Sequence, residues 1–301
     1  MSQPWDAEKI VTPELAATLI RAQFPALPVR RVEPLGQGWD NTAFLVDQSI
    51  VFRFPRKASA VALLETEARA LPRLAPRLPV NIPVPEWHGR PADSFPWPFL
   101  GHRLVPGEIA ADANLSVTER TALAPALAEF LARLHRIRDS ALELPPDLLD
   151  RANFTQRRPL LEQRLQVLVD HGHISDAAPW LEILRRTPES RAPRTPVPVH
   201  GDFYACHMLV DNSRRLLGVI DWGDVHVGDP AIDLMALFGF LPAEARPEFL
   251  HVYGPIDQQT RSTARLRAAF HAVAVAWYGS QLNDQALLHE GLTAMQFVLQ
   301  D

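Results

Sequence analysis

Residues 200–211 read His-Gly-Asp-Phe-Tyr-Ala-Cys-His-Met-Leu-Val-Asp, and residues 218–224 read Gly-Val-Ile-Asp-Trp-Gly-Asp. Asp202 follows a proline-defined extended segment, and Asp221 stands at the end of an apolar strand, so each carboxylate lies on a loop. The apolar stretches on either side of a polar turn at 211–215 predict a hairpin that brings the two carboxylates together. Such a pair suits phosphoryl transfer, in which one carboxylate orients a hydroxyl and accepts its proton while the other holds a divalent metal on phosphate oxygens.

The same pattern also has a structural interpretation, in which the aspartates only cap turns and the next helix. Residues 228–234 read Gly-Asp-Pro-Ala-Ile-Asp-Leu, with Asp229 directly before a proline at a helix start. We therefore expect capping roles for Asp229 and Asp233. For Asp202 and Asp221, the catalytic and the structural interpretation both stay open.

A second candidate site lies near the amino terminus. Gly36-Gln37-Gly38 stands between two predicted strands and can let backbone N–H groups approach a phosphate, although it also fits a plain β-turn. It lacks the spacing of the dinucleotide-binding fingerprint and the lysine of the P-loop. The glycine loop is followed by a cation on the next strand, Arg53, and by a carboxylate on the next helix, Glu67. Together with the two loop aspartates, these residues occur in the same order along the chain as the functional residues of a protein-kinase-like phosphoryl transferase.

The rest of the chain predicts a β-rich first part and a helical second part. Hydrophobic periodicity and turn signals predict the following elements: strands at 32–35, 43–46 and 50–54, a helix at 59–74, an edge strand within 96–104, a helix at 116–136 with Ser116 as N-cap and Glu119 completing a capping box, helices within 150–190, and mostly helix after 229. We expect an α+β fold with a hinge near 100–107, dividing the chain into lobes 1–104 and 105–301.

Composition excludes several classes of protein. The 301 residues carry 30 cations and 35 anions, a net charge of −5, which argues against a nucleic-acid binder. Only Lys9 and Lys57 are lysines, so the other 28 cations are arginines. The single cysteine, Cys206, excludes an internal disulfide and a cysteine-based zinc cluster. No apolar run is long enough for a membrane span, so we expect a cytoplasmic protein, a monomer or weak dimer.

These motifs together resemble the aminoglycoside phosphotransferase family over about residues 33–240. The residues that carry the resemblance are Gly36-Gln37-Gly38-Trp39-Asp40-Asn41, Val51-Phe52-Arg53-Phe54-Pro55-Arg56, His200-Gly201-Asp202, Ile220-Asp221-Trp222 and Gly228-Asp229-Pro230-Ala231-Ile232-Asp233-Leu234. The resemblance implies a protein-kinase-like fold of two lobes. It also implies transfer of a γ-phosphoryl group from ATP or GTP, with Mg²⁺, to a hydroxylated small molecule, with neither nucleic acid nor membrane as a partner.

The resemblance also implies a role for each matching residue. Asp202 would be the catalytic base or hydroxyl-orienting carboxylate, and Asp221 the metal ligand. Glu67 would pair with Arg53, which grips the nucleotide phosphates. The residues expected to lie against the rest of the nucleotide are Gly36, Gly38 and Asn41 over the phosphates and His102, Arg103 and Leu104 at the base. We expect His200 and His135 to be structural.

Two residues depart from the family pattern. Arg53 stands where kinases have lysine, and arginine binds phosphate as a bulkier, bidentate group. His207 stands where kinases have an asparagine that helps to hold a second metal, and imidazole prefers softer metals than Mg²⁺. Macrolide phosphotransferases are similar at His207, which favours that acceptor class slightly. Both one and two metal ions stay open, as does a nucleotide-binding pseudokinase with a regulatory role. A protein kinase is disfavoured because no activation segment follows Asp221.

Overall fold

The computed structural model describes residues 7–154, 157–186 and 195–300. The chain forms two compact units. We call the first the sheet unit, made of Met1–Arg77, Asn81–Val105 and Ser140–Glu143. We call the second the helical unit, made of Leu78–Val80, Pro106–Asp139 and Leu144–Asp301.

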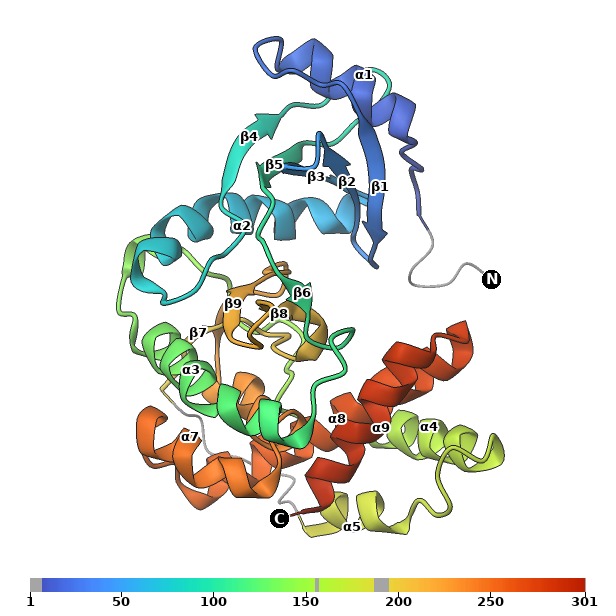
Figure 1. Ribbon diagram of the computed structural model, residues 1–301, viewed down its shortest axis with the longest axis vertical. Helices are drawn as coiled ribbons and strands as arrows, with labels where there is room; N and C mark the ends of the chain where they lie inside the picture. Colours follow the sequence, from blue (N-terminus) through green and yellow to red (C-terminus); the bar gives the residue numbers. More distant parts are fainter. Residues whose placement is uncertain (1–6, 155–156, 187–194, 301) are drawn as a thin grey trace. The chain divides into compact units, whose positions relative to one another are not determined.

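The sheet unit is an antiparallel five-stranded sheet with two helices (Figure 1). Its elements are α1 (Pro13–Gln23), β1 (Val32–Gln37), β2 (Asn41–Val46), β3 (Ile50–Pro55), α2 (Val61–Leu74), β4 (Pro85–Gly89) and β5 (Phe99–Arg103). The strand order is β1-β2-β3-β5-β4. The strand predicted within 96–104 exists as β5, but its predicted position at the edge of the sheet is wrong. It pairs with β3 on one side and with β4 on the other, so β5 is an internal strand.

Alternation along β3 separates a packed face from a functional face. Phe52 and Phe54 are fully buried in a cluster with Leu19 and Ile20 of α1. Because successive side chains of a strand point to opposite faces, Arg53 lies on the other face, where α2 supplies its partner. The core of phenylalanines thus fixes the strand that presents Arg53.

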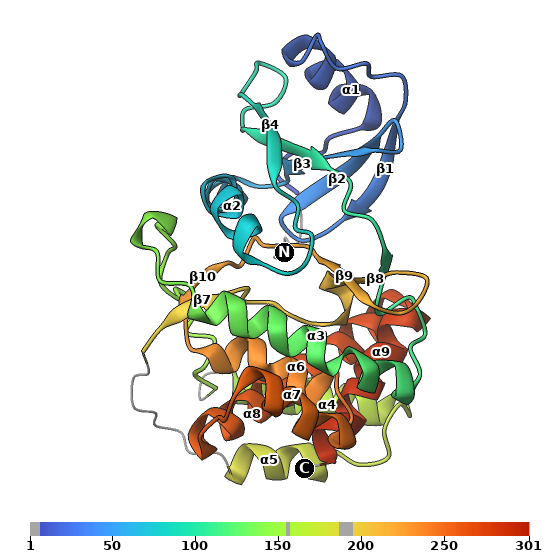
Figure 2. The same ribbon diagram turned by 60° about the vertical axis from the view of Figure 1, so that its left-hand side comes forward.

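The helical unit holds two small sheets among its helices (Figure 2). Its helices are α3 (Val117–Arg136), α4 (Arg158–Asp170), α5 (Ala178–Arg186), α6 (Ala236–Gly239), α7 (Arg246–Tyr253), α8 (Gln258–Leu282) and α9 (Gln285–Leu299). Its strands are β6 (Glu108–Ile109), β7 (Val197–Val199), β8 (Met208–Val210), β9 (Leu216–Val219) and β10 (His226–Gly228). The order β6-β8-β9 forms one sheet and β10-β7 the other.

Local signals set the boundaries of the long helices. The predicted capping box is confirmed, because Ser116 accepts from the backbone of Glu119 and Glu119 accepts from the backbone of Ser116 at the start of α3. Inside the unit, Arg120 of α3 and Glu290 of α9 form a buried ion pair. Within the described ranges, no helix is both long and apolar enough to cross a membrane.

Candidate active site

The loop between β7 and β8 carries the first carboxylate and needs a glycine to do so. Gly201 has a φ of +90°, a conformation that side chains with a Cβ rarely adopt. A Cβ at this position would lie 2.3 Å from the backbone oxygen of Asp224. The His-Gly-Asp motif therefore encodes a sharp turn pressed against the loop that follows Asp221.

Asp233 holds this loop from behind. Its Oδ2 accepts from the backbone N–H of His200 at 2.7 Å, and its Oδ1 accepts from that of Gly201 at 2.9 Å. His135 Nε2 lies 3.2 Å from the same Oδ2. Burial acts to raise the pKa of Asp233, but the hydrogen bond from His135, the charges of His135 and His200 and the N–H of Gly201 together outweigh it, so this pKa lies below its usual value. The expected structural role is confirmed, but as a loop brace rather than a helix cap.

The neighbouring expectations are borne out by the contacts. Asp229 is the N-cap of the short helix at Pro230–Met235, accepting from the backbone N–H of Ala231 at 2.9 Å. His200 is completely buried, and its Nε2 donates to the carbonyl oxygen of Ile220 at 3.0 Å. Because Ile220 precedes Asp221, His200 connects the loop of Asp202 with the loop of Asp221 and has the structural role predicted for it.

Asp202 is held by a histidine that the sequence analysis missed. His271 of α8 lies with its Nε2 3.2 Å from Asp202 Oδ1. Burial acts to raise the pKa of Asp202, but the hydrogen bond from His271 and the charges of His207 and Arg267 outweigh it and lower that pKa far below its usual value. Asp202 is therefore ionised throughout the ordinary pH range.

Asp221 and His207 come together through the β8–β9 hairpin. The backbone N–H of Ile220 donates to the carbonyl oxygen of His207 at 2.9 Å. His207 Nε2 then lies 3.3 Å from Asp221 Oδ2. The predicted hairpin is confirmed, and it places Asp202, His207 and Asp221 in one cluster. Asp221 has a φ of +61°, which aims its half-exposed carboxylate out of the strand direction.

The donor set of this cluster fits one divalent ion. His207 Nδ1 donates to the carbonyl oxygen of Asp202 at 2.8 Å, so Nε2 is the ring nitrogen that faces Asp221. Asp221 Oδ2 and His207 Nε2, 3.3 Å apart, would be the two side-chain atoms that hold such an ion. The described part of the chain holds no group of three or more His, Cys, Asp or Glu side chains that could hold a metal ion by itself.

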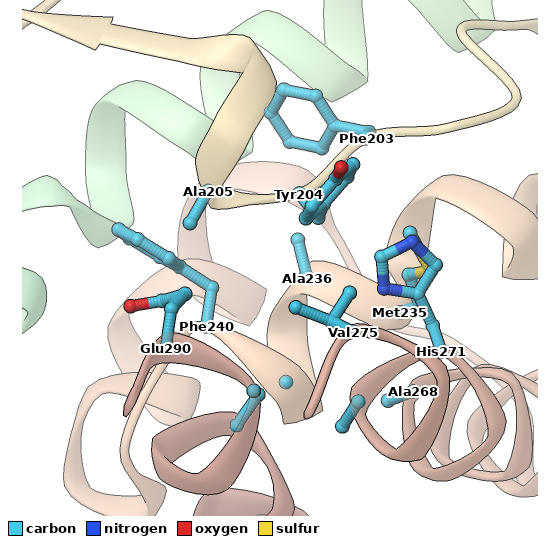
Figure 3. A pocket seen from close by; sticks show the side chains of 14 residues that line it. Phe203, Tyr204, Ala205, Met235, Ala236, Phe240, Ala268, His271, Val275 and Glu290 are labelled. Atoms are coloured by element: carbon cyan, nitrogen blue, oxygen red, sulfur yellow. The ribbon is translucent and has the colours of Figure 1, made fainter. Parts of the chain in front are cut away.

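A pocket lies beside the loop that carries Asp202, and Phe203, Tyr204 and Ala205 of this loop contribute to its lining (Figure 3). Its cavity volume is about 30 Å³, and it is lined by Phe203, Tyr204, Ala205, Met235, Ala236, Gly239, Phe240, Ala268, His271, Ala272, Val275, Glu290, Gly291 and Ala294. Alanines and glycines leave the space, and Figure 3 shows His271 and Tyr204 at one end and Glu290 with Phe240 at the other. The lining is mainly apolar, and its polar side chains are Tyr204, His271 of α8 and Glu290 of α9.

In the sheet unit, Arg53 and Glu67 form the predicted pair. Arg53 Nη1 lies 2.5 Å from Glu67 Oε2, and both side chains are largely buried. Arginine presents five N–H donors in a fixed fork, a geometry that suits carboxylate and phosphate oxygens.

The glycine loop is tied at its base and open at its tip. A Cβ at Gly36 would meet no atom within 4 Å, and Gly38 donates its N–H to the carbonyl oxygen of Asn41 at 3.0 Å. The buried Oδ1 of Asn41 has no hydrogen-bond partner among the residues that the structure describes. Lys57 lies 3.0 Å from Asp40 Oδ1, so this lysine braces the loop.

Residues 102–104 are expected to contact the nucleobase, and two of their backbone groups form hydrogen bonds within the protein. Leu104 donates its N–H to the carbonyl oxygen of Ser49 at 2.8 Å, and His102 Nδ1 donates to the carbonyl oxygen of Arg103 at 2.7 Å. Burial, opposed by this hydrogen bond, lowers the pKa of His102 to about 4. Base contacts by His102, Arg103 and Leu104 stay a prediction.

Among solved structures, the complex of APH(2″)-IIIa with GDP and kanamycin is similar over 93% of this chain and 97% of that chain, with a TM-score of 0.67 and 28% identity. A macrolide 2′-phosphotransferase from Brachybacterium faecium shares the fold, with a TM-score of 0.60 and 22% identity over 93% of this chain and 98% of that chain. The expected protein-kinase-like fold is thereby confirmed.

Sequence comparison adds two findings. Viomycin phosphotransferase of Streptomyces vinaceus is 32% identical over 102 residues, which are 33% of this chain and span about a third (36%) of that relative. The model of the phosphotransferase enzyme family matches residues 31–271, most of the chain and every candidate site residue. The chain therefore belongs to the phosphotransferase enzyme family, as the motifs at 36–41, 200–202 and 220–234 predict.

Proposed function

We propose that this protein transfers the γ-phosphoryl group of ATP or GTP to a hydroxyl of a small molecule, an aminoglycoside- or macrolide-type antibiotic or a related metabolite. The observation that carries the proposal is the convergence of Asp202, His207 and Asp221 at the ends of one hairpin. In this proposal residues 1–104 bind the nucleotide and residues 105–301 carry out the transfer.

Asp202 would orient the acceptor hydroxyl. Its Oδ1 already accepts from His271, which leaves Oδ2 for the hydroxyl hydrogen of the acceptor. Because its pKa lies so far below neutrality, Asp202 holds this proton only transiently, and its main contribution is position and negative charge. Positioning and charge complementarity supply most of the catalysis in phosphoryl transfer.

Asp221 and His207 would hold Mg²⁺, which when bound neutralises charge on the phosphate oxygens. Arg53, fixed by Glu67, would bind phosphate oxygens, and the open loop with Gly36, Gly38 and Asn41 would lie over them. The pocket beside the catalytic loop would receive the part of the acceptor next to the reacting hydroxyl. Its apolar lining supports an acceptor that carries alkyl groups near that hydroxyl.

The test is a nucleotide-consumption screen. Purified protein with Mg·ATP or Mg·GTP is tested against kanamycin, viomycin, a macrolide and common hydroxylated metabolites, and product is identified by mass. We expect a phosphorylated product with at least one acceptor and none after chelation of the metal. The variant Asp202→Ala should lose turnover while still showing nucleotide-induced thermal stabilisation.

Two outcomes would contradict the proposal. Undiminished turnover by the D202A variant would remove Asp202 from its role. Thermal stabilisation by nucleotides, without product from any acceptor, would instead identify the regulatory pseudokinase that Arg53 and His207 left open.

A further inference from the structure

We propose that His271 is a positioning residue of the reaction: its Nε2–H fixes the Asp202 carboxylate so that Oδ2 alone faces the acceptor hydroxyl. This inference rests on the proposed function. It concerns a residue of α8, 69 positions after Asp202 in the chain.

The first step is the direction of the hydrogen bond. An ionised carboxylate can only accept, so the atom of His271 that lies 3.2 Å from Asp202 Oδ1 must carry the hydrogen. Burial lowers the pKa of His271, so the ring is neutral near pH 7 and carries one N–H. The structure therefore requires the Nε2–H tautomer of His271.

The second step concerns Oδ2 of Asp202 and its distance from His207. Oδ2 of Asp202 lies 3.7 Å from Nδ1 of His207, beyond hydrogen-bond distance, and that nitrogen donates to the backbone oxygen of Asp202 instead. One histidine thus binds a carboxylate oxygen while the other binds the backbone of the same residue. With Oδ1 and the backbone both held, rotation of the Asp202 side chain is restricted and Oδ2 keeps one direction.

The third step is the rigidity of His271 itself. Its ring packs edge-on against the ring of Tyr204 with centroids 4.3 Å apart (Figure 3), and Tyr204 also packs against the ring of His207 with centroids 4.6 Å apart. Only 16% of the His271 side chain is exposed. Arg267, one turn earlier on α8, is also buried, and its charge attracts the same carboxylate. A carboxylate that is held by a rigid neighbour loses less conformational entropy when the acceptor binds.

The experiment compares two substitutions at one position. His271→Phe keeps a ring and removes the donor, whereas His271→Gln restores an N–H donor at similar reach. His289→Phe, on the exposed face of α9, makes the same chemical change away from the site and is the matched control. The assay measures kcat and KM with the acceptor found in the screen, and hydrolysis of Mg·ATP or Mg·GTP with water as the acceptor.

We expect H271F to lower kcat about 10–100-fold, as loss of a supporting hydrogen-bond partner usually does, with the nucleotide KM unchanged. H271Q should recover most of kcat, and H289F should match the wild type. Wild-type kcat in H271F, or equal loss of kcat in H271F and H271Q, would overturn the proposal. In the second case the ring would matter for packing alone.

Nitrogen NMR reports the tautomer of the His271 ring directly and does not require enzymatic turnover. Long-range ¹⁵N–¹H correlations of the wild-type protein should show the Nε2–H tautomer of His271, and Asp202→Ala should release that preference. The Nδ1–H tautomer in the wild type would overturn the proposal even if H271F folded poorly. Absence of nucleotide turnover by the wild type would refute the proposed function, whereas the tautomer would still report on the hydrogen bond.

Discussion

Replacing Asp233 with asparagine tests whether the catalytic loop depends on the carboxylate behind it. Oδ2 of Asp233 accepts from His200 N–H and lies within reach of His135 Nε2, while Oδ1 accepts from Gly201 N–H. Asparagine keeps one oxygen, so its amide N–H₂ group must face a donor. A hydrogen bond to a charged group contributes about 1.5–3 kcal/mol, and a buried donor left without a partner costs about 1–3 kcal/mol more.

The expected loss is therefore about 3 kcal/mol of unfolding free energy, which is a fall in Tm of roughly 5 °C for a chain of 301 residues. Differential scanning fluorimetry measures it. Asp229→Asn is the matched control, because asparagine caps a helix as well as aspartate does. Loss of turnover should accompany the loss of stability, since the brace sets the position of Asp202.

The pH dependence has a defined sign. The pKa of Asp233 is lowered in the folded protein, so its stabilisation is complete above the unfolded value of about 4 and is lost as pH falls through the folded value. The difference in Tm between the wild type and D233N should stay constant from pH 8 to about 5 and narrow below about 4. A D233N variant as stable as D229N would refute the brace.

Two further predictions concern backbone geometry and phosphate binding. Gly201→Ala forces a Cβ to 2.3 Å from Asp224 and should lower Tm far more than Gly172→Ala, which has a similar positive φ but open space around it; equal shifts in thermal unfolding would contradict the close contact. Arg53→Met should raise the nucleotide KM by at least about tenfold, by loss of charge-assisted hydrogen bonds, whereas Arg53→Lys should raise it less. Unchanged nucleotide affinity in isothermal titration of R53M would exclude Arg53 from the phosphate site.

Much of the active site could be predicted because its residues are close in sequence. The hairpin from His207 to Asp221 is local, so turn signals and apolar alternation were enough to bring the two residues together. The pairing of Arg53 with Glu67 follows from strand alternation and one neighbouring helix. The capping box at Ser116 is also a local pattern.

The missed features depend on contacts distant in sequence. His271 reaches Asp202 only because α8 packs beside the catalytic loop, and its one sequence signal is a histidine in the alanine-rich stretch 268–276. Asp233 follows Asp229 at a helix start, so capping was the natural expectation, and only tertiary packing turns its carboxylate toward Gly201. The place of β5 inside the sheet depends on its pairing with β4, a strand that the sequence pattern did not predict and that begins at a proline, Pro85.

The arrangement around Asp233 bears on how such a protein can change its acceptor during evolution. His135, His200 and Asp233 hold the loop by contacts among themselves, while small residues such as Ala272 and Ala294 shape the pocket beside it. Mutations that enlarge these small side chains reshape the pocket without breaking the hydrogen bonds of the brace. If the pocket receives the acceptor as proposed, substitutions at Ala272 or Ala294 would change the acceptor preference while the hydrogen bonds that hold the loop of Asp202 stay intact.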